Sequence, residues 1–189
     1  SIEIVNNIVP FCDVQVKQMK EVALVRFLFL GNIDKRKGIF DVLESVKQNK
    51  KLFENKIKII IGGDGEVERL KQIISEYNLS DTVEYVGWVL GEKKRELFVN
   101  SDVMLLPSYN EGLPISLLEA LSYKMPLIST HVGGISEILE HKKNGYVVEP
   151  GNIDQITESL RFYLENKSLI KLHGDNSYRI ANKYFPEFV

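Results

Sequence analysis

The sequence has little of what marks secreted, membrane-spanning or nucleic-acid-binding proteins. Its 189 residues include one cysteine, Cys12, so no internal disulfide can form, which is typical of a reducing compartment. No apolar run approaches the roughly 18 residues that a membrane-spanning helix needs. The formal net charge of -2 gives no sign of a nucleic-acid-binding protein. Residues 1–7 lack a basic start and a long apolar block, so we expect no signal peptide. The missing initial Met is compatible with a piece of a longer protein.

Signatures of metal sites and of nicotinamide sites are also missing. The sequence holds no D-x-D motif, and its three histidines are scattered, so we predict no metal site. These are His131, His141 and His173. Gly62-Gly-Asp-Gly65 resembles the start of a dinucleotide fingerprint, but Glu68 occupies the place of the third glycine. We therefore expect these glycines only to turn a strand into a helix.

The sequence does have the composition of a globular domain, with 44% hydrophobic and 26% charged residues. Short apolar runs alternate with segments of helical periodicity. The expected strands span residues 26–30, 57–61, 83–86, 102–106, 125–130 and 146–148, after a short strand near residues 2–5. The expected helices span residues 39–53, 66–77, 92–100, 114–121, 136–140, 153–165 and 169–184. This alternation predicts an α/β domain whose parallel sheet, of about six strands, is covered on both faces.

Ligands of such a sheet bind outside the carboxyl ends of its strands. The loops expected there are rich in glycine, which lets the backbone approach a ligand closely. These glycines are Gly31, Gly62, Gly63, Gly65, Gly87, Gly112, Gly133 and Gly134. Residues 35–37, Lys-Arg-Lys, form the dense basic cluster of these loops, and helix N-termini that follow offer N–H groups to an anion. We interpret the cluster as a phosphate-binding element rather than a solvated turn.

Two carboxylates flank the start of the helix expected after Pro114. Glu111 precedes this helix, and Glu119 lies roughly 12 Å further along if the segment is helical. That distance is too long for a close acid–base pair. It suits two hydroxyl-bearing groups with an anion between them at the helix N-terminus, such as a sugar, a diphosphate and a ribose. The alternative is that Glu111 is only a charge at a helix N-terminus and Glu119 a partly buried acid paired elsewhere; the residues alone leave both interpretations open.

Residues 107–120, Pro-Ser-Tyr-Asn-Glu-Gly-Leu-Pro-Ile-Ser-Leu-Leu-Glu-Ala, resemble the E-x7-E segment of retaining GT-B glycosyltransferases, the glycosyl transferases group 1 family (family 4 of the carbohydrate-enzyme classification). Further segments resemble the family's other motifs in the same order: residues 6–9, 31–38, 61–65 and 126–134, the last followed by Glu137, Asn144 and Gly145. The resemblance covers nearly the whole chain. It implies that residues 1–189 form a Rossmann-like three-layer domain, the donor-binding C-terminal half of a GT-B fold, without the N-terminal acceptor domain.

The resemblance also implies roles for individual residues. Glu111 would hold hydroxyls of the donor sugar, Lys37 would bind the diphosphate, and we treat both as catalytic. Glu119 would hold the ribose hydroxyls. The backbone of Gly87, Trp88 and Val89 would read the base. The remaining donor-binding positions are Gly31, Asn32, Arg36, Gly63, Gly112, Leu113 and Ile115.

Two positions depart from the family pattern. Asn32 stands where the family usually has Arg, so a bidentate cationic clamp is lost unless Arg36 replaces it. Pro114 stands where many members have Gly, and it offers no N–H to a phosphate. The N–H groups of Leu113 and Ile115 remain for that purpose.

The function implied is transfer of a sugar, with retention, from a UDP-, GDP- or ADP-sugar to a glycan or lipid-linked acceptor in cell-envelope polysaccharide synthesis. No cofactor and no nucleic acid are expected. The reaction would take place in the cytoplasm, at the inner face of the membrane, with peripheral membrane association of the full-length protein. Two alternatives stay open: a GT-B sugar-nucleotide enzyme that is not a transferase, such as an epimerase, and a non-catalytic nucleotide-binding module serving a partner subunit.

Overall fold

Six parallel strands form one sheet in the computed structural model, which describes residues 24–184. Their order across the sheet is β3-β2-β1-β4-β5-β6. The strands are β1 (Val25–Leu30), β2 (Ile57–Gly62), β3 (Val83–Gly87), β4 (Val103–Leu106), β5 (Leu127–Ser129) and β6 (Gly145–Val147). This order is that of the Rossmann fold, and the predicted α/β class and strand number are confirmed. The strand expected near residues 2–5, the motif at residues 6–9 and Cys12 lie outside the described residues.

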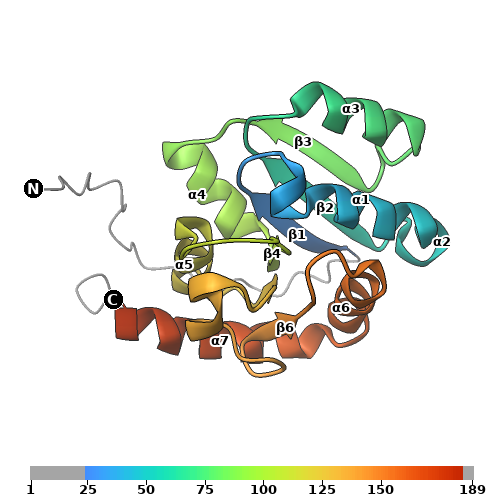
Figure 1. Ribbon diagram of the computed structural model, residues 1–189. Helices are drawn as coiled ribbons and strands as arrows, with labels where there is room; N and C mark the ends of the chain where they lie inside the picture. The colour runs from blue at the N-terminus through green and yellow to red at the C-terminus, as the bar shows by residue number, and fades with distance from the viewer. Residues whose placement is uncertain (1–23, 185–189) are drawn as a thin grey trace, which may run out of the picture.

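Helices cover both faces of the sheet, as predicted. They are α1 (Ile39–Gln48), α2 (Lys50–Phe53), α3 (Val67–Glu76), α4 (Gly91–Asn100), α5 (Ile115–Ser122), α6 (Ile153–Glu165) and α7 (Lys167–Tyr184), with 3-10 turns η1 (Lys35–Lys37) and η2 (Gly133–Glu137). Helix α1 packs against α3 and α6, and α5 packs against α7. Figure 1 shows α1, α2, α3 and α6 toward the right and α4 and α5 toward the left, with the sheet between the two groups. None of the described helices is long and apolar enough to cross a bilayer.

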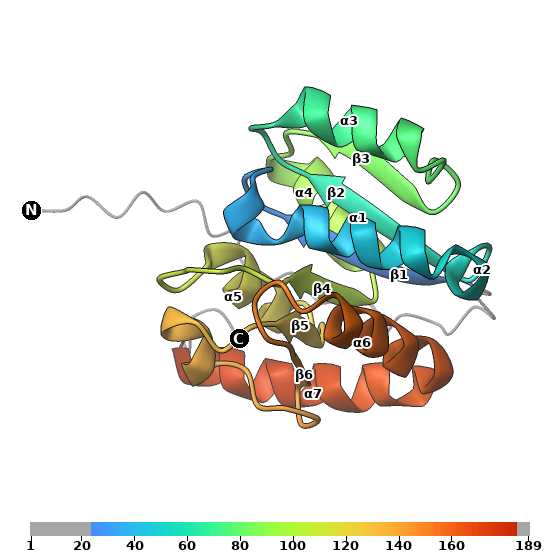
Figure 2. The ribbon, with the colours of Figure 1, turned by 45° about the vertical axis from the view of Figure 1, so that its right-hand side comes forward.

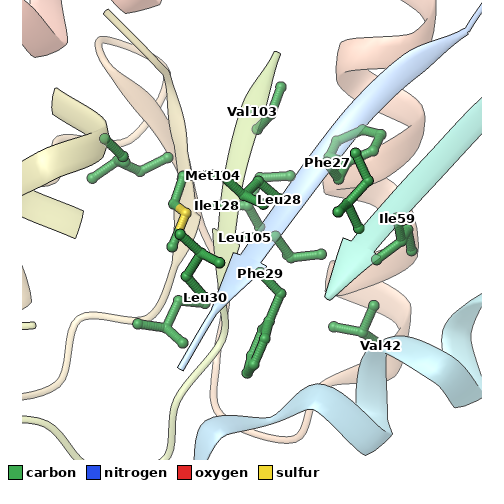
Figure 3. Close-up of a cluster of buried hydrophobic side chains, with 14 of the residues drawn as sticks. Phe27, Leu28, Phe29, Leu30, Val42, Ile59, Val103, Met104, Leu105 and Ile128 are labelled. Carbon is green, nitrogen blue, oxygen red and sulfur yellow. The ribbon is translucent and has the colours of Figure 1, made fainter. Parts of the chain in front are cut away.

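Continuous apolar strands build the core because both of their faces are covered. Strand β1 pairs along its length with β2 and, on its other side, with β4. Its residues Phe27, Leu28 and Phe29 are all inaccessible to solvent. Figure 3 shows Phe27 and Phe29 on the side of Ile59 and of Val42 from α1, and Leu28 and Leu30 on the opposite side. Alternate residues of one strand therefore pack into different layers.

Three expected helices differ from the structure. The helix expected over residues 39–53 is interrupted at Asn49, whose backbone is not helical and whose side-chain amide donates to the carbonyl of Ser45 at 3.0 Å. Asn side chains compete in this way with helical hydrogen bonds. The helix expected over residues 136–140 is instead the 3-10 turn η2. The helix expected to begin at Pro114 begins at Ile115, because Pro114 is the extended N-cap residue.

The order of the strands places the topological switch point of the sheet between β1 and β4. The chain runs outward from β1 to β3 on one side and from β4 to β6 on the other, so connections diverge at this point. In open α/β sheets the ligand site lies at such a point, outside the carboxyl ends. Figure 2 shows the turn after β1, the loop into α5 and the orange segment before β6 gathered at the same left-hand edge.

Candidate functional site

Lys37 and Glu111 meet where the loops after β1 and β4 come together. Lys37 lies in η1, after β1, and Glu111 lies in the loop between β4 and α5. The Lys37 ammonium donates to Oε1 of Glu111 at 2.6 Å, and the hydroxyl of Ser108 donates to the same oxygen at 2.7 Å. The side chain of Glu111 is 8% exposed and that of Lys37 is 24% exposed. A largely buried carboxylate is thus held by one cation and one hydroxyl from different loops.

Asp34 organises the turn that carries Lys37. Its carboxylate caps η1 by accepting from the Lys37 backbone N–H at 3.1 Å, and it accepts from Asn32 at 2.7 Å and from Arg36 at 3.0 Å. Burial opposes the ionised form, but these three hydrogen bonds outweigh it and hold the pKa of Asp34 below its ordinary value. The backbone carbonyl of Arg36 accepts from Tyr109 N–H at 2.7 Å, which ties η1 to the β4–α5 loop. Asn32 and Arg36 thus both bind Asp34.

The β5–η2 segment supports the loop that carries Glu111. The buried hydroxyls of Ser129 and Thr130 donate to the carbonyls of Leu106, at 2.5 Å, and Ser108, at 2.7 Å. Gly134 N–H donates to the carbonyl of Gly112 at 2.7 Å. Gly133 has a left-handed backbone (φ +55°), and a Cβ there would overlap the carbonyl oxygen of Glu111. Glycine is therefore required where the two loops touch.

Glu119 does not join Glu111 but pairs with Lys94 from α4. The Lys94 ammonium donates to Oε1 of Glu119 at 2.7 Å and lies 2.6 Å from Oε2. The two side chains are 27% and 22% exposed. Each of the two predicted carboxylates therefore has a lysine partner distant in sequence. The structure therefore shows Glu119 as a partly buried, paired acid, and its contact with a ligand stays a prediction.

The loops after β1, β2 and β3 are packed one upon another. Gly31 N–H donates to the carbonyl of Gly62 at 3.2 Å, and Gly63 N–H donates to the carbonyl of Gly87 at 3.0 Å. A Cβ at Gly63 would overlap the carbonyl oxygen of Gly31. These glycines thus allow close approach of neighbouring loops, and the structure brings Gly31, Gly63 and Gly87 into contact along the predicted edge.

The ends of the predicted site expose apolar side chains. Trp88 is 65% exposed, whereas Val89 is buried. Ile115, in the first turn of α5, is 68% exposed, and Leu113 is 38% exposed. The first N–H groups of an α-helix have no partner within the helix. Those of α5 follow the β4 loop that carries Glu111, whose carboxylate contacts Lys37. Gly112 has open space around its Cα, with no atom within 4 Å of a Cβ built there.

Ser108, Thr130 and Lys94 were not identified from the sequence as site residues. Ser108 and Thr130 could have been noticed as small polar residues directly after buried strands, but nothing in the sequence connects Lys94 with Glu119. Among residues 24–184, no group of three or more His, Cys, Asp or Glu side chains could hold a metal ion. A separate depression of about 590 Å³ is lined by Gln48 and residues 149–154, and its Glu149 and Asp154 make it unsuited to a diphosphate.

The strand order defines a Rossmann-type α/β domain, and two lysine–carboxylate pairs, Lys37–Glu111 and Lys94–Glu119, lie among the elements that follow its strands. Residues 16–180 match the family model described as "Glycosyl transferases group 1". The chain therefore belongs to the glycosyl transferases group 1 family.

Curated relatives of the chain are about twice its length. An uncharacterized glycosyltransferase of Methanocaldococcus jannaschii is 32% identical over 130 residues, which cover 68% of this chain and 33% of that protein. N-acetyl-alpha-D-glucosaminyl L-malate synthase of Bacillus anthracis is 30% identical over 151 residues, which cover 79% of this chain and 39% of the relative. The matched residues thus cover 33% and 39% of the length of these two relatives.

Solved glycosyltransferase structures share the fold. The C-terminal domain of the glycosyl transferase group 1 family protein LpcC from Francisella tularensis superposes with a TM-score of 0.75 at 22% identity, covering 85% of this chain and 86% of that domain. Anabaena HepE in complex with UDP and glucose superposes with a TM-score of 0.75 at 20% identity, covering 85% of this chain and 44% of HepE. The six-stranded sheet and its helices therefore match GT-B glycosyltransferase C-terminal domains.

Proposed function

We propose that this chain is the donor-binding domain of a retaining glycosyltransferase that uses a nucleoside diphosphate sugar. The observation that carries the proposal is the pair of lysine–carboxylate contacts, Lys37–Glu111 and Lys94–Glu119, at the carboxyl edge of the sheet. Such a site offers carboxylates for sugar and ribose hydroxyls and a cation for the diphosphate between them. The complex of HepE with UDP and glucose supports a donor of this class.

In this proposal Glu111 accepts hydrogen bonds from hydroxyls of the donor sugar, and Ser108 keeps its carboxylate in place. Lys37, which in the free protein contacts Glu111, binds the diphosphate together with the N-terminus of α5. Glu119 accepts from the ribose hydroxyls. The backbone of residues 87–89 lies against the base. The N–H groups of Gly112, Leu113 and Ile115 provide further donors, while Asn32 and Arg36 act on the phosphates through the turn that Asp34 holds.

The proposed reaction replaces the bond between the sugar and the diphosphate with a bond to an acceptor hydroxyl, on the same face of the sugar. Negative charge grows on the departing diphosphate as positive charge grows at the sugar carbon. Lys37 and the positive end of α5 would stabilise the diphosphate, and this favours the transition state over the bound donor. The acceptor and the group that receives its proton would be held by an N-terminal domain. We therefore expect this chain alone to bind nucleotide but to transfer little sugar.

Names of further relatives support a role in cell-envelope polysaccharide synthesis. They include a putative colanic acid biosynthesis glycosyltransferase of Escherichia coli, 28% identical over 142 residues, and a putative teichuronic acid biosynthesis glycosyltransferase of Bacillus subtilis, 27% identical over 136 residues. We accordingly propose a glycan or lipid-linked acceptor and a reaction in the cytoplasm at the inner membrane face. Retention is tested by NMR of the product that the full-length protein forms, because the anomeric configuration of the transferred sugar should equal that of the donor.

Calorimetric titration of the chain with UDP, GDP and ADP tests donor binding. We expect one diphosphate to bind, and we expect Lys37→Met and Glu119→Gln each to weaken its binding at least about tenfold, since each removes a charge-assisted contact. Lys71→Met serves as a matched control, because its ion pair with Glu68, at 2.9 Å, lies on the exposed surface of α3. If Lys71→Met weakens binding as much as Lys37→Met does, the assignment of the site is contradicted.

Intrinsic fluorescence gives an independent reading of the base end of the site. Trp88 is the only tryptophan of the chain and is 65% exposed, directly after β3. A base bound at residues 87–89 should change its emission. If calorimetry shows binding while the emission of Trp88 stays unchanged, the base lies elsewhere.

A further inference from the structure

Lys94 of α4 reaches Glu119 of the neighbouring helix α5. Its neighbours in the sequence have other partners: Lys93 donates to the carbonyl of Val86 at 3.1 Å, and Arg95 pairs with Glu92 of its own helix at 3.0 Å and bonds to the side chain of Tyr123 at the end of α5. The Lys94 ammonium lies 2.6–2.7 Å from both carboxylate oxygens of Glu119. This contact joins the first turns of α4, which follow β3, to α5, which follows β4.

The two helices are held together by aromatic packing next to this contact. Phe98 of α4 stacks on Tyr123, at the end of α5, with ring centroids 4.9 Å apart and planes 5° from parallel. The Lys94 ammonium is 6.0 Å from the Phe98 ring centroid. Such a stack stabilises helix packing through buried area, whereas a partly exposed ion pair adds little. The ion pair is therefore not required to hold α4 against α5.

The hydrogen-bonding capacity of the pair matches a vicinal diol. Oε2 of Glu119 is shielded from solvent and lies 2.6 Å from the Lys94 ammonium, which also donates to Oε1 at 2.7 Å. A lysine ammonium has three N–H donors, so at least one remains beside its contacts with the two oxygens of Glu119. A carboxylate can only accept, but each hydroxyl of a diol both donates and accepts. With Lys94 present, a hydroxyl that donates to Glu119 can also accept from the ammonium.

We propose that Lys94 is a specificity-determining residue that completes a diol site with Glu119 and makes the protein select ribonucleoside over 2′-deoxyribonucleoside diphosphates. This inference rests on the proposed function, because it takes the diol to be the ribose of the donor. A 2′-deoxyribose leaves one N–H of Lys94 and one acceptor of Glu119 without a partner. Sites built to bond a hydroxyl reject the analogue that lacks it.

The test compares UDP with 2′-deoxy-UDP, and likewise the GDP and ADP pairs, by calorimetry on the full chain. For the base that binds, we expect the wild type to prefer the ribonucleotide about tenfold, the effect of losing one charge-assisted hydrogen bond at a partly exposed site. In Lys94→Met this preference should fall below about threefold, while Lys94→Arg should keep most of it. Lys71→Met, the matched control on α3, should leave the preference unchanged.

The outcomes separate this inference from the proposed function. A wild type that binds none of the six nucleotides overturns both. A wild type whose ribose preference persists in Lys94→Met overturns the role of Lys94 and leaves the donor site standing. A second measurement needs no variant: the side-chain ammonium resonance of Lys94 should shift with the ribonucleotide much more than with the 2′-deoxy analogue. Equal shifts would contradict the proposal even if Lys94→Met did not fold.

Discussion

Replacing Lys37 with Met should destabilise the free protein, because it leaves the carboxylate of Glu111 with Ser108 as the side chain that still bonds to it. Exposed ion pairs contribute about 0–1 kcal/mol, whereas removing one partner of a buried pair costs about 3–5 kcal/mol. Glu111 is 8% exposed and Lys37 24% exposed, so this pair lies between those limits. With the Ser108 hydrogen bond retained, we expect a loss of about 2 kcal/mol, or about 4–8 °C in Tm for a chain of this length.

Urea and thermal denaturation of a double-mutant cycle measure this contribution. Glu111→Gln should cost less than Lys37→Met, because the neutral amide still accepts from Ser108 and leaves no buried charge. The double variant should then be more stable than the sum of the two single effects predicts, by about 1 kcal/mol. Lys71→Met, which breaks an exposed pair on α3, should change stability by less than about 0.5 kcal/mol. A partly buried charge pair at this position is contradicted if the effects in the cycle are strictly additive. It is also contradicted if the Lys37→Met variant is as stable as the Lys71→Met variant.

Three further predictions concern pH and backbone. Burial lowers the pKa of His173 below its ordinary 6.5, although a hydrogen bond with the backbone of Lys142 opposes this shift. As pH falls, the unfolded chain therefore takes up the proton before the folded chain does, and the free energy of unfolding should decrease below about pH 6.5. In a series of thermal melts between pH 5 and 8, His173→Gln should weaken this pH dependence. Asp34→Ala should remove the η1 cap, at a cost of about 1 kcal/mol in stability, and should weaken diphosphate binding. In the wild type the stability that this cap contributes should be lost in acid, as pH falls through the lowered pKa of Asp34. If calorimetry shows that the variant binds the diphosphate as tightly as the wild type, the η1 turn is not part of the binding site. Gly133→Ala should destabilise the protein by more than about 2 kcal/mol, because the backbone there is left-handed and the added Cβ would overlap the carbonyl oxygen of Glu111. Gly112→Ala has open space around the added Cβ and should melt like the wild type. Equal melting temperatures for the two variants would contradict the packing described for these loops.

Features encoded locally could be predicted from the sequence. The apolar runs of β1, β2 and β4 and the turn residues that end them show strand type and burial directly, and strands alternating with helices imply a parallel sheet. The break at Asn49 was missed because it depends on one side chain competing for the carbonyl of Ser45. The turn η2 was missed because its conformation follows from contact with the β4–α5 loop, which lies about twenty residues earlier.

The site was predictable to the extent that it lies in loops at one edge of the sheet. Parallel strands bring those loops together, so Lys37 and Glu111 could be expected in the same region. Their hydrogen bond could not, and neither could the partnership of Lys94 with Glu119, because both depend on how α4, α5 and η1 pack in three dimensions. Contacts between residues distant in sequence are fixed by packing rather than by local pattern.

A crystal structure of the chain with the nucleoside diphosphate that it binds would show directly whether the donor site lies where we propose. We predict phosphate oxygens within hydrogen-bonding distance of the Lys37 ammonium and near the start of α5, and ribose hydroxyls on Glu119. A nucleotide seated instead in the depression lined by Gln48 and residues 149–154, or a diphosphate that touches neither Lys37 nor α5, would contradict the proposed donor site.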